Sequence, residues 1–249
     1  MRWALELVSK INLQGDERLL DIGCGDGKVT ARIAESLSRG SVTGIDSSPE
    51  MIDYAKKSFP ETEYPNISFQ VMDAADLKFS GEFDYVFSNA TLHWVKDQHA
   101  VMKGVAKSLK TGGKLFIQMG AKGNASAMFE VMNELIRRDK WKPFFENTNT
   151  LYNFFLPDEY RVFIKNAGLS PIRIEVVPKE MVHQGTDGIK NWLRSVWLPY
   201  TQRVPDNERE EFINLLTENF EKENPPDING IFHIDMLRLE VEAEKISDY

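Results

Sequence analysis

A glycine-rich turn separates an apolar run from a predicted helix in the stretch LLDIGCGDGKVT, residues 19–30. Three of five consecutive residues there are glycine, and Asp21 stands two residues before the first of them. In an α/β sheet such a turn places the free N–H groups of a helix amino terminus against a ligand, and the missing side chains allow close approach. The stretch therefore predicts an α/β sheet with a ligand at the carboxyl end of its first strand.

Strand and helix patterns alternate along the first half of the chain, as they do in a parallel sheet. Ser48 and Pro49 have the residue types of a helix N-cap and of the first helical position. Strands are predicted at residues 18–23, 41–46, 67–73, 83–89 and 114–120, and helices at 2–11, 28–38, 48–59 and 99–110.

The second half of the chain is less regular. Its patterns predict helices at 123–141, 157–168, 187–197 and 205–223, and strands at 170–182 and 230–245. The segment 142–157 is rich in aromatic residues and lacks a period, which makes it a candidate lid or pocket wall. No repeat or linker divides the chain, so we predict a single domain over residues 1–249.

Composition narrows the class of protein. A formal net charge of −8 gives no general basic surface for nucleic acid or for anionic lipid. Cys24 is the only cysteine, so an internal disulfide and a cysteine-based zinc site are both excluded, and we read Cys24 as a small filler in the turn. No apolar run reaches the roughly 20 residues of a membrane span. We expect a cytoplasmic protein that binds a small molecule, contacts neither nucleic acid nor membrane, holds no metal, and is a monomer or weak homo-oligomer.

The turn departs from the dinucleotide-binding fingerprint. Gly23 and Gly25 occupy its first two glycine positions, but Lys28 stands at the sixth position and Gly27 comes one residue early. A carboxylate at Asp21 would repel a pyrophosphate, whereas it suits a ligand with an ammonium group. S-adenosylmethionine is such a ligand, since it is a nucleoside without phosphates that carries a free amino-acid end.

Two further acids end the next two predicted strands. Asp46 comes 19 residues after Gly27, where an acid can accept hydrogen bonds from both ribose hydroxyls, and Asp73 is placed to meet an adenine amino group. Each acid taken alone is as well explained as a cap or a solvated loop residue. The phased set of three favours a nucleoside cofactor.

The motifs LLDIGCGDG, VTGIDSSPEMIDYAKK, VMDAAD, FDYVFSNATLHWV and LKTGGKLFIQM resemble, in order and spacing, those of the class I S-adenosylmethionine-dependent methyltransferases. This resemblance implies a Rossmann-like, doubly wound α/β fold whose seven-stranded sheet has a reversed last strand. It implies a cofactor-binding part at about residues 12–120, and a helical cap with substrate-side elements at about 121–230. It implies cofactor contacts from Asp21, Gly23 and Gly25 at the methionyl end, Asp46 at the ribose, Ser47, Met51, Asp73 and Ala74 around the adenine, and Asn89 near the sulfonium.

The stretches SNATLHWVKDQHAVM and WLPYTQRVPDNEREEFINLL are similar to those of the trans-aconitate methyltransferase group and of related carboxylic acid methyltransferases. A carboxylate is already ionised, so its methylation needs alignment in a dry pocket and no general base. His93 and Trp94 are the candidate catalytic residues, with a loop histidine and a core tryptophan as the structural alternatives. Trp197, Tyr200 and Arg203 are the candidate substrate-binding residues.

Two departures from the group bear on the substrate. Leu198 stands where the trans-aconitate enzymes have an arginine, which favours a more apolar acid. The group also has an N-terminal helix that begins further upstream, so we expect a lid that is shortened here or lies outside this sequence.

Three alternatives remain at this point. In the first, the chain is an enzyme that methylates nitrogen, oxygen or carbon of another metabolite, with His93 as a base where the chemistry needs one. In the second, the chain binds S-adenosylmethionine without catalysis. In the third, the chain is a nicotinamide dehydrogenase, which Asp21 and Lys28 disfavour.

Overall fold

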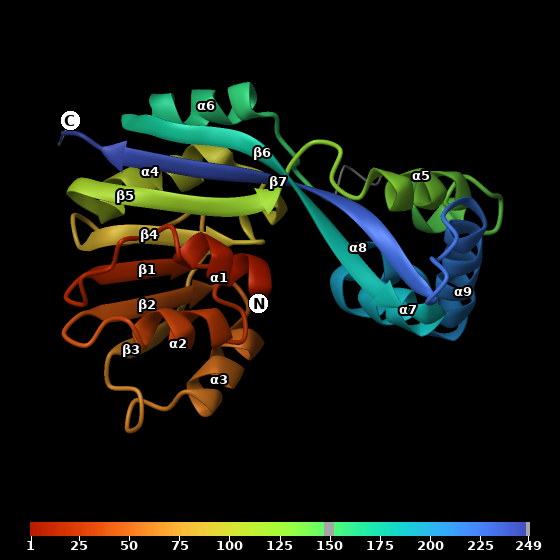
Figure 1. The fold of residues 1–249 in the computed structure, drawn as a ribbon, viewed down its shortest axis with the longest axis horizontal. Coiled ribbons are helices and arrows are strands. Elements are labelled where there is room, and N and C mark those ends of the chain that lie inside the picture. The colour runs from red at the N-terminus through yellow and green to blue at the C-terminus, as the bar shows by residue number, and fades with distance from the viewer. Residues whose placement is uncertain (147–151, 248–249) are drawn as a thin grey trace. The chain divides into compact units, whose positions relative to one another are not determined.

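The computed structural model describes residues 1–146 and 152–247. Within them lies a seven-stranded sheet of order β3-β2-β1-β4-β5-β7-β6 (Figure 1). The first five strands pair in parallel, and β7 pairs antiparallel with β5, from Lys114 opposite Glu244 to Gly120 opposite Arg238. The predicted α/β sheet with a reversed last strand is confirmed. The strands are β1 (Arg18–Ile22), β2 (Ser41–Asp46), β3 (Ile67–Val71), β4 (Phe83–Asn89), β5 (Leu109–Gly120), β6 (Leu169–Gln184) and β7 (Ile231–Lys245).

The helices follow the predicted order with small shifts at their ends. Ser48 caps α3 as predicted, because its Oγ accepts the Met51 N–H at 3.1 Å. Gly168 follows α6 at a φ of +79°, a conformation that ends a helix. The elements are α1 (Arg2–Val8), α2 (Lys28–Ala34), α3 (Pro49–Ser58), η1 (Leu92–Trp94), α4 (Gln98–Ser108), α5 (Ser126–Leu135), η2 (Lys142–Phe144), α6 (Pro157–Asn166), α7 (Gly185–Val196), α8 (Leu198–Thr201) and α9 (Asp206–Glu223).

Contacts divide the chain into two compact units. Unit 1 comprises residues 1–121, 152–177 and 238–249, and unit 2 comprises residues 122–151 and 178–237. Strands β6 and β7 contribute residues to both units. This division into units does not test whether the chain is a single domain, so the single-domain assignment stays a prediction.

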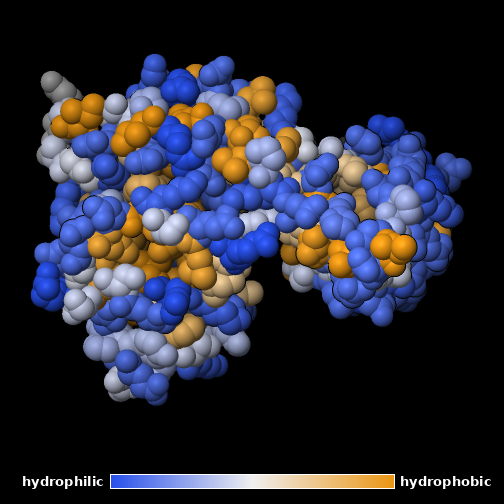
Figure 2. Space-filling view, in the orientation of Figure 1, coloured by the Kyte–Doolittle hydropathy of each residue, from blue (hydrophilic) through white to orange (hydrophobic). Residues whose placement is uncertain are grey.

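Unit 1 is a layered α/β structure. Helices α1, α2 and α3 lie over one face of the sheet, and α4 lies over the other (Figure 1). Between the sheet and the first three helices is a hydrophobic cluster that includes Leu7, Leu19, Ile33, Ile52 and Phe69, none of which is more than 5% exposed. The viewed face of unit 1 is mostly hydrophilic, with hydrophobic residues showing in a hollow over the middle of the sheet (Figure 2).

Unit 2 is mainly helical. Helix α9 packs against both α5 and α7. Its core holds Phe212, Leu216 and Phe220 of α9, together with Trp141, whose ring centroid lies 5.1 Å from that of Phe212. The predicted lid or pocket-wall segment, 142–157, includes residues 147–151, which lie outside the described residues.

Candidate active site

The glycine-rich turn joins β1 to α2 and is fixed by its own backbone. The N–H groups of Gly23 and Cys24 both donate to the Ile45 carbonyl of β2, at 2.7 and 2.9 Å. Gly23, Gly25 and Gly27 all have positive φ, between +52° and +80°, where side chains are strained. The turn therefore needs glycine for its conformation alone.

The glycines differ in what surrounds them. A Cβ at Gly23 would lie 2.1 Å from Cγ2 of Thr91, and one at Gly27 would lie 2.8 Å from the Phe69 ring. A Cβ at Gly25 would meet no atom of the described residues within 4 Å. Gly23 and Gly27 thus serve packing, whereas the backbone at Gly25 faces open space where a ligand can approach.

Asp46 closes the turn from the end of β2. Its Oδ2 accepts the Gly25 N–H and its Oδ1 accepts the Ser48 N–H, each at 3.0 Å. The side chain is half-buried, so the carboxylate is both held in place and open on one side. This is the arrangement that a ligand with paired hydroxyl donors requires.

Asp21 lies beneath the turn and is only 2% exposed. The Thr30 hydroxyl donates to its Oδ2 at 2.6 Å. Burial raises the pKa of Asp21 to about 7, and the nearby Asp46 charge adds to that rise. The carboxyl therefore changes its proton near neutral pH, and its state responds to any cation bound above it.

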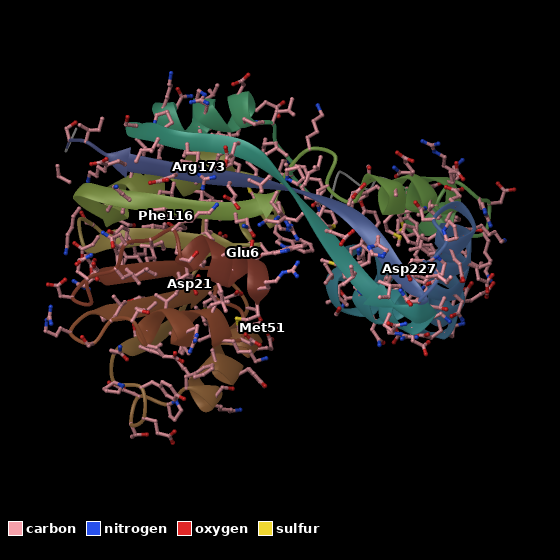
Figure 3. All side chains as sticks on the ribbon, viewed as in Figure 1. Glu6, Asp21, Met51, Phe116, Arg173 and Asp227 are labelled. Atoms are coloured by element: carbon pink, nitrogen blue, oxygen red, sulfur yellow. The ribbon has the colours of Figure 1, made fainter. Side chains whose placement is uncertain are left out.

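The residues predicted around an adenine follow β2 and β3. Ser47, Met51 and Asp73 are exposed, and Ala74 is buried. Asp73 Oδ1 accepts the Ala75 N–H at 2.8 Å, which shapes the bend after β3. Asp21 lies on β1 and Met51 in the first turn of α3 (Figure 3). Because the carboxyl ends of parallel strands share one edge of the sheet, these residues form a row along it.

The loop after β4 completes that edge. Asn89 is half-buried at the end of the strand, and its carbonyl accepts the Thr91 hydroxyl at 3.2 Å. The same hydroxyl lies 3.1 Å from the Gly23 carbonyl, so Thr91 links the loop to the glycine-rich turn. No local sequence pattern predicted the role of Thr91, because its partner lies 68 residues away.

His93 is buried among aromatic rings. It is 6% exposed, and the rings of Trp94, Tyr152 and Phe154 have centroids 5.5–5.7 Å from its own. Its Nδ1 accepts the Gly120 N–H at 3.5 Å, which leaves the proton on Nε2. Burial, with a smaller effect from the Arg238 charge, lowers the pKa of His93 to about 3, so the ring is neutral at physiological pH. Trp94 is 39% exposed and is therefore not a core residue.

The predicted substrate residues Trp197, Tyr200 and Arg203 all belong to unit 2. Trp197 and Tyr200 are 2% and 8% exposed, and their ring centroids are 5.7 Å apart. Arg203 is exposed, and its Nε donates to the Pro199 carbonyl at 3.2 Å. Trp197 and Tyr200 thus stand in the packed interior of the unit, and Arg203 on its surface.

The rest of the described structure offers weaker candidates for a functional site. A hollow at the amino ends of β1, β2 and β3 is lined by Arg18, Thr43 and Lys56 among others, and none of the predicted site residues borders it. Among residues 1–146 and 152–247, no three His, Cys, Asp or Glu side chains are grouped to hold a metal ion. In the same residues no helix combines the length and apolarity of a membrane span. Burial raises the pKa of the Cys24 thiol, which agrees with its reading as a filler.

Comparison with known proteins decides the family. The profile of a family described as "Methyltransferase domain" matches residues 13–154, more than half of the chain. The chain is a class I S-adenosylmethionine-dependent methyltransferase. The cofactor of this methyltransferase is S-adenosylmethionine.

Two relatives are similar to this chain in sequence, and one solved structure is similar to it in fold. The methyltransferase is 28% identical to trans-aconitate 2-methyltransferase of Rhizobium etli over 98% of this chain and 93% of the other. It is 27% identical to juvenile hormone acid O-methyltransferase of Drosophila melanogaster over 80% of this chain and 69% of the other. The fold matches geranyl diphosphate C-methyltransferase of Streptomyces coelicolor, solved with S-adenosyl-L-homocysteine, with a TM-score of 0.59, 17% identity, and coverage of 98% and 80%.

The cofactor edge fits S-adenosylmethionine. The space at Gly25 admits a ligand against the backbone, the Asp46 carboxylate can accept ribose hydroxyls, and Asp21 can pair with an ammonium group once it is ionised. No basic side chain is needed in the turn, because this cofactor carries no phosphate.

Proposed function

We propose that this methyltransferase transfers the methyl group to the carboxylate of a small organic acid and forms a methyl ester. Both reported relatives carry names of acid methyltransferases, for trans-aconitate and for juvenile hormone acid. The observation that carries the proposal is the setting of His93, which is buried among aromatic rings and accepts the Gly120 N–H at Nδ1, so the ring has no free lone pair to take a proton. Burial also lowers the pKa of His93. A carboxylate acceptor needs no base, whereas a phenol or carbon acid does.

The cofactor contacts are part of the same proposal. Asp46 would hold the ribose hydroxyls, and Gly23 and Gly25 would line the methionyl part with Asp21 beneath. Ser47, Met51, Asp73 and Ala74 would surround the adenine, and the Asn89 carbonyl would face the amino group. When bound, S-adenosylmethionine supplies an electrophilic methyl carbon and a neutral sulfur leaving group.

The chain's own residues would then align the acceptor and exclude water. The Nε2–H of His93 would donate to the acceptor oxygen that does not react, so that the other oxygen faces the methyl group. Trp94, Tyr152 and Phe154 would give the pocket apolar walls that strip water from the acid. The assignment of Trp197, Tyr200 and Arg203 as substrate-binding residues stays a prediction. Cytoplasmic location and a monomeric or weakly associated state stay predictions.

The product identifies the reaction. Methyl-tritiated S-adenosylmethionine is incubated with the enzyme and a panel of carboxylic acids, amines and phenols, and the product is then hydrolysed in alkali. Volatile tritiated methanol from an acid is the expected result. Label that stays non-volatile, or that appears only with amines or phenols, would refute ester formation.

His93 provides a second test. We expect His93→Ala to lower kcat/KM for the acid at least tenfold, because one hydrogen bond to the acceptor and part of the pocket wall are lost. Affinity for S-adenosylhomocysteine should stay within twofold. The wild-type kcat/KM should show no inflection from His93 between pH 5.5 and 8. An inflection near pH 6.5 that the variant abolishes would assign His93 as a base instead.

A further inference from the structure

Arg238 of β7 is a buried cation without an acidic partner. The residue is 8% exposed, and within residues 1–146 and 152–247 no carboxylate lies at salt-bridge distance from its guanidinium. Its Nε is buried without a hydrogen-bond partner. Burial lowers the pKa of Arg238 to about 10, so the guanidinium is still charged at neutral pH. An unpaired buried charge is costly unless something outside the fold compensates it.

A neighbouring charge shows how the chain handles buried ions elsewhere. Glu240 lies two residues further along β7 and is fully buried, yet it is paired with Lys10, with Arg173 at 2.9 Å and with Gln118 at 2.9 Å. Arg173 belongs to β6 (Figure 3). The fold therefore pairs the buried charge of Glu240 with three donors but leaves the nearby charge of Arg238 without an acidic partner among the described residues.

A second unpaired donor stands beside Arg238. The indole ring of Trp3 in α1 lies 4.6 Å from the guanidinium carbon, and its Nε1 is also buried without a hydrogen-bond partner. The Arg238 guanidinium and the Trp3 indole N–H together favour a ligand that is negatively charged and has several acceptor oxygens. A carboxylate has this chemistry.

The position of Arg238 in the sheet favours the carboxylate of the methyl acceptor over a group of the cofactor as its ligand. Arg238 lies opposite Gly120, whose N–H donates to His93. The glycine-rich turn follows β1, which is separated from β7 by β4 and β5. Three strand spacings amount to about 14 Å, so Arg238 stands on the His93 side of the edge, away from the turn and Asp46.

We propose that Arg238, with Trp3, binds the carboxylate of the acid acceptor, and that the aromatic rings around His93 select an acid with an apolar body. This inference rests on the proposed ester-forming function. Arg238 is here a substrate-binding and specificity-determining residue. The sequence did not single it out because an arginine in a strand reads as a surface residue.

The test compares Arg238→Met, which removes the charge at similar length, with Arg238→Lys, which keeps the charge without the planar fork. Decanoate is titrated into each protein's complex with S-adenosylhomocysteine by calorimetry, and KM is measured with the acid that the wild type esterifies best. Arg39→Met is the matched control, because its side chain is 70% exposed on the surface of the same unit. Thermal unfolding of every variant is recorded.

We expect Arg238→Met to weaken decanoate binding and to raise the acid KM by about 10-fold to 100-fold, with a smaller effect for Arg238→Lys. Affinity for S-adenosylhomocysteine should stay within twofold, and Arg39→Met should match the wild type. The Tm of Arg238→Met should be unchanged or higher, because an unpaired buried charge is removed.

Several results would overturn the inference. An unchanged acid KM and decanoate affinity in Arg238→Met would show that the guanidinium does not bind the acceptor. A loss confined to S-adenosylhomocysteine would assign Arg238 to the carboxylate of the cofactor. Absence of decanoate binding to the wild type would refute the apolar acid. Wild-type transfer only to amines or phenols is a different outcome, because it refutes the ester-forming function itself.

Discussion

The glycine-rich turn of unit 1 and the aromatic cluster of unit 2 are held by different forces. In the turn, polar groups satisfy one another, as Asp46 does with Gly25 and Ser48, and Asp21 with Thr30. In the aromatic cluster, which comprises Phe129, Trp192, Trp197 and Tyr200, ring packing fixes the positions. There Trp192 Nε1 is buried without a hydrogen-bond partner among the residues that the structure describes. The turn is thus specified by directional hydrogen bonds, and the cluster by burial.

The sharpest way to break the turn is Gly23→Ala. The new methyl group would lie 2.1 Å from the Thr91 side chain, at a φ of +75° that already disfavours alanine. We expect S-adenosylhomocysteine affinity to fall more than 100-fold, measured by calorimetry, together with a lower Tm. Gly25→Ala is the control for stability, because it shares the positive φ but meets no atom, so its Tm should fall less. The double variant Gly23→Ala, Thr91→Gly should regain part of the loss, and wild-type affinity in the single variant would contradict the contact.

In the aromatic cluster the corresponding change is Trp197→Ala. Removal of a ring that is 2% exposed should lower the free energy of unfolding by about 3–5 kcal/mol, through lost burial and the cavity left behind. The measurement is chemical denaturation followed by circular dichroism. Leu198→Ala, at a neighbouring position that is 39% exposed, should cost less than about 1 kcal/mol. Equal losses for both variants would show that Trp197 is not a core residue.

Asp46 tests whether the hydrogen-bonded edge also binds the cofactor. We expect Asp46→Ala to weaken S-adenosylhomocysteine binding by about 1–3 kcal/mol, a rise in Kd of roughly 5-fold to 150-fold, because charge-assisted hydrogen bonds are lost. Asp53→Ala removes an equally charged group from the exposed side of α3 and should change nothing. An unchanged Kd for Asp46→Ala would remove this residue from the site.

The smallest effect concerns the proton on Asp21. With a pKa of about 7 in the free protein, the carboxyl must lose its proton before it can pair with an ammonium group. We therefore expect S-adenosylhomocysteine affinity to rise about tenfold from pH 6 to pH 8, with release of up to one proton. Calorimetry in two buffers of different ionisation enthalpy measures that release, and Asp21→Asn should abolish it. Release that persists in the variant would point to another group.

The raised pKa of Asp21 makes folding stability fall with rising pH, whereas it makes ligand affinity rise. Because the folded-state pKa of Asp21 lies above its ordinary value of 3.8, the protonated carboxyl favours the folded state. Its contribution to stability is complete below about pH 3.8 and is lost as the pH rises through about 7. In the absence of ligand, Asp21→Asn should flatten the pH dependence of Tm within that window.

The difference between the two regions also explains what the sequence could predict. The Ser48 cap and the alternation of strands and helices depend on neighbours in the chain, and the turn needs glycine for its own backbone angles, so residue types reveal all three. The roles of Thr91 and Arg238 depend on contacts with residues far away in sequence, and no local pattern announces them. Trp197 could not be assigned from sequence either, because a tryptophan fits both a pocket wall and a packed core. Only its burial in the structure distinguishes the two.

The pairing of β7 with β5 has a consequence for synthesis on the ribosome. Gly120 at the end of β5 pairs with Arg238, so roughly 120 residues must be translated before the partner strand exists. At about 5–20 residues per second, the β5 edge waits on the order of ten seconds with its N–H and C=O groups unpaired. A nascent chain in that interval displays an open strand edge that chaperones can bind and that neighbouring nascent chains can join. Expression at lower temperature or with added chaperones should therefore raise the soluble yield more for this enzyme than for a sheet closed in chain order.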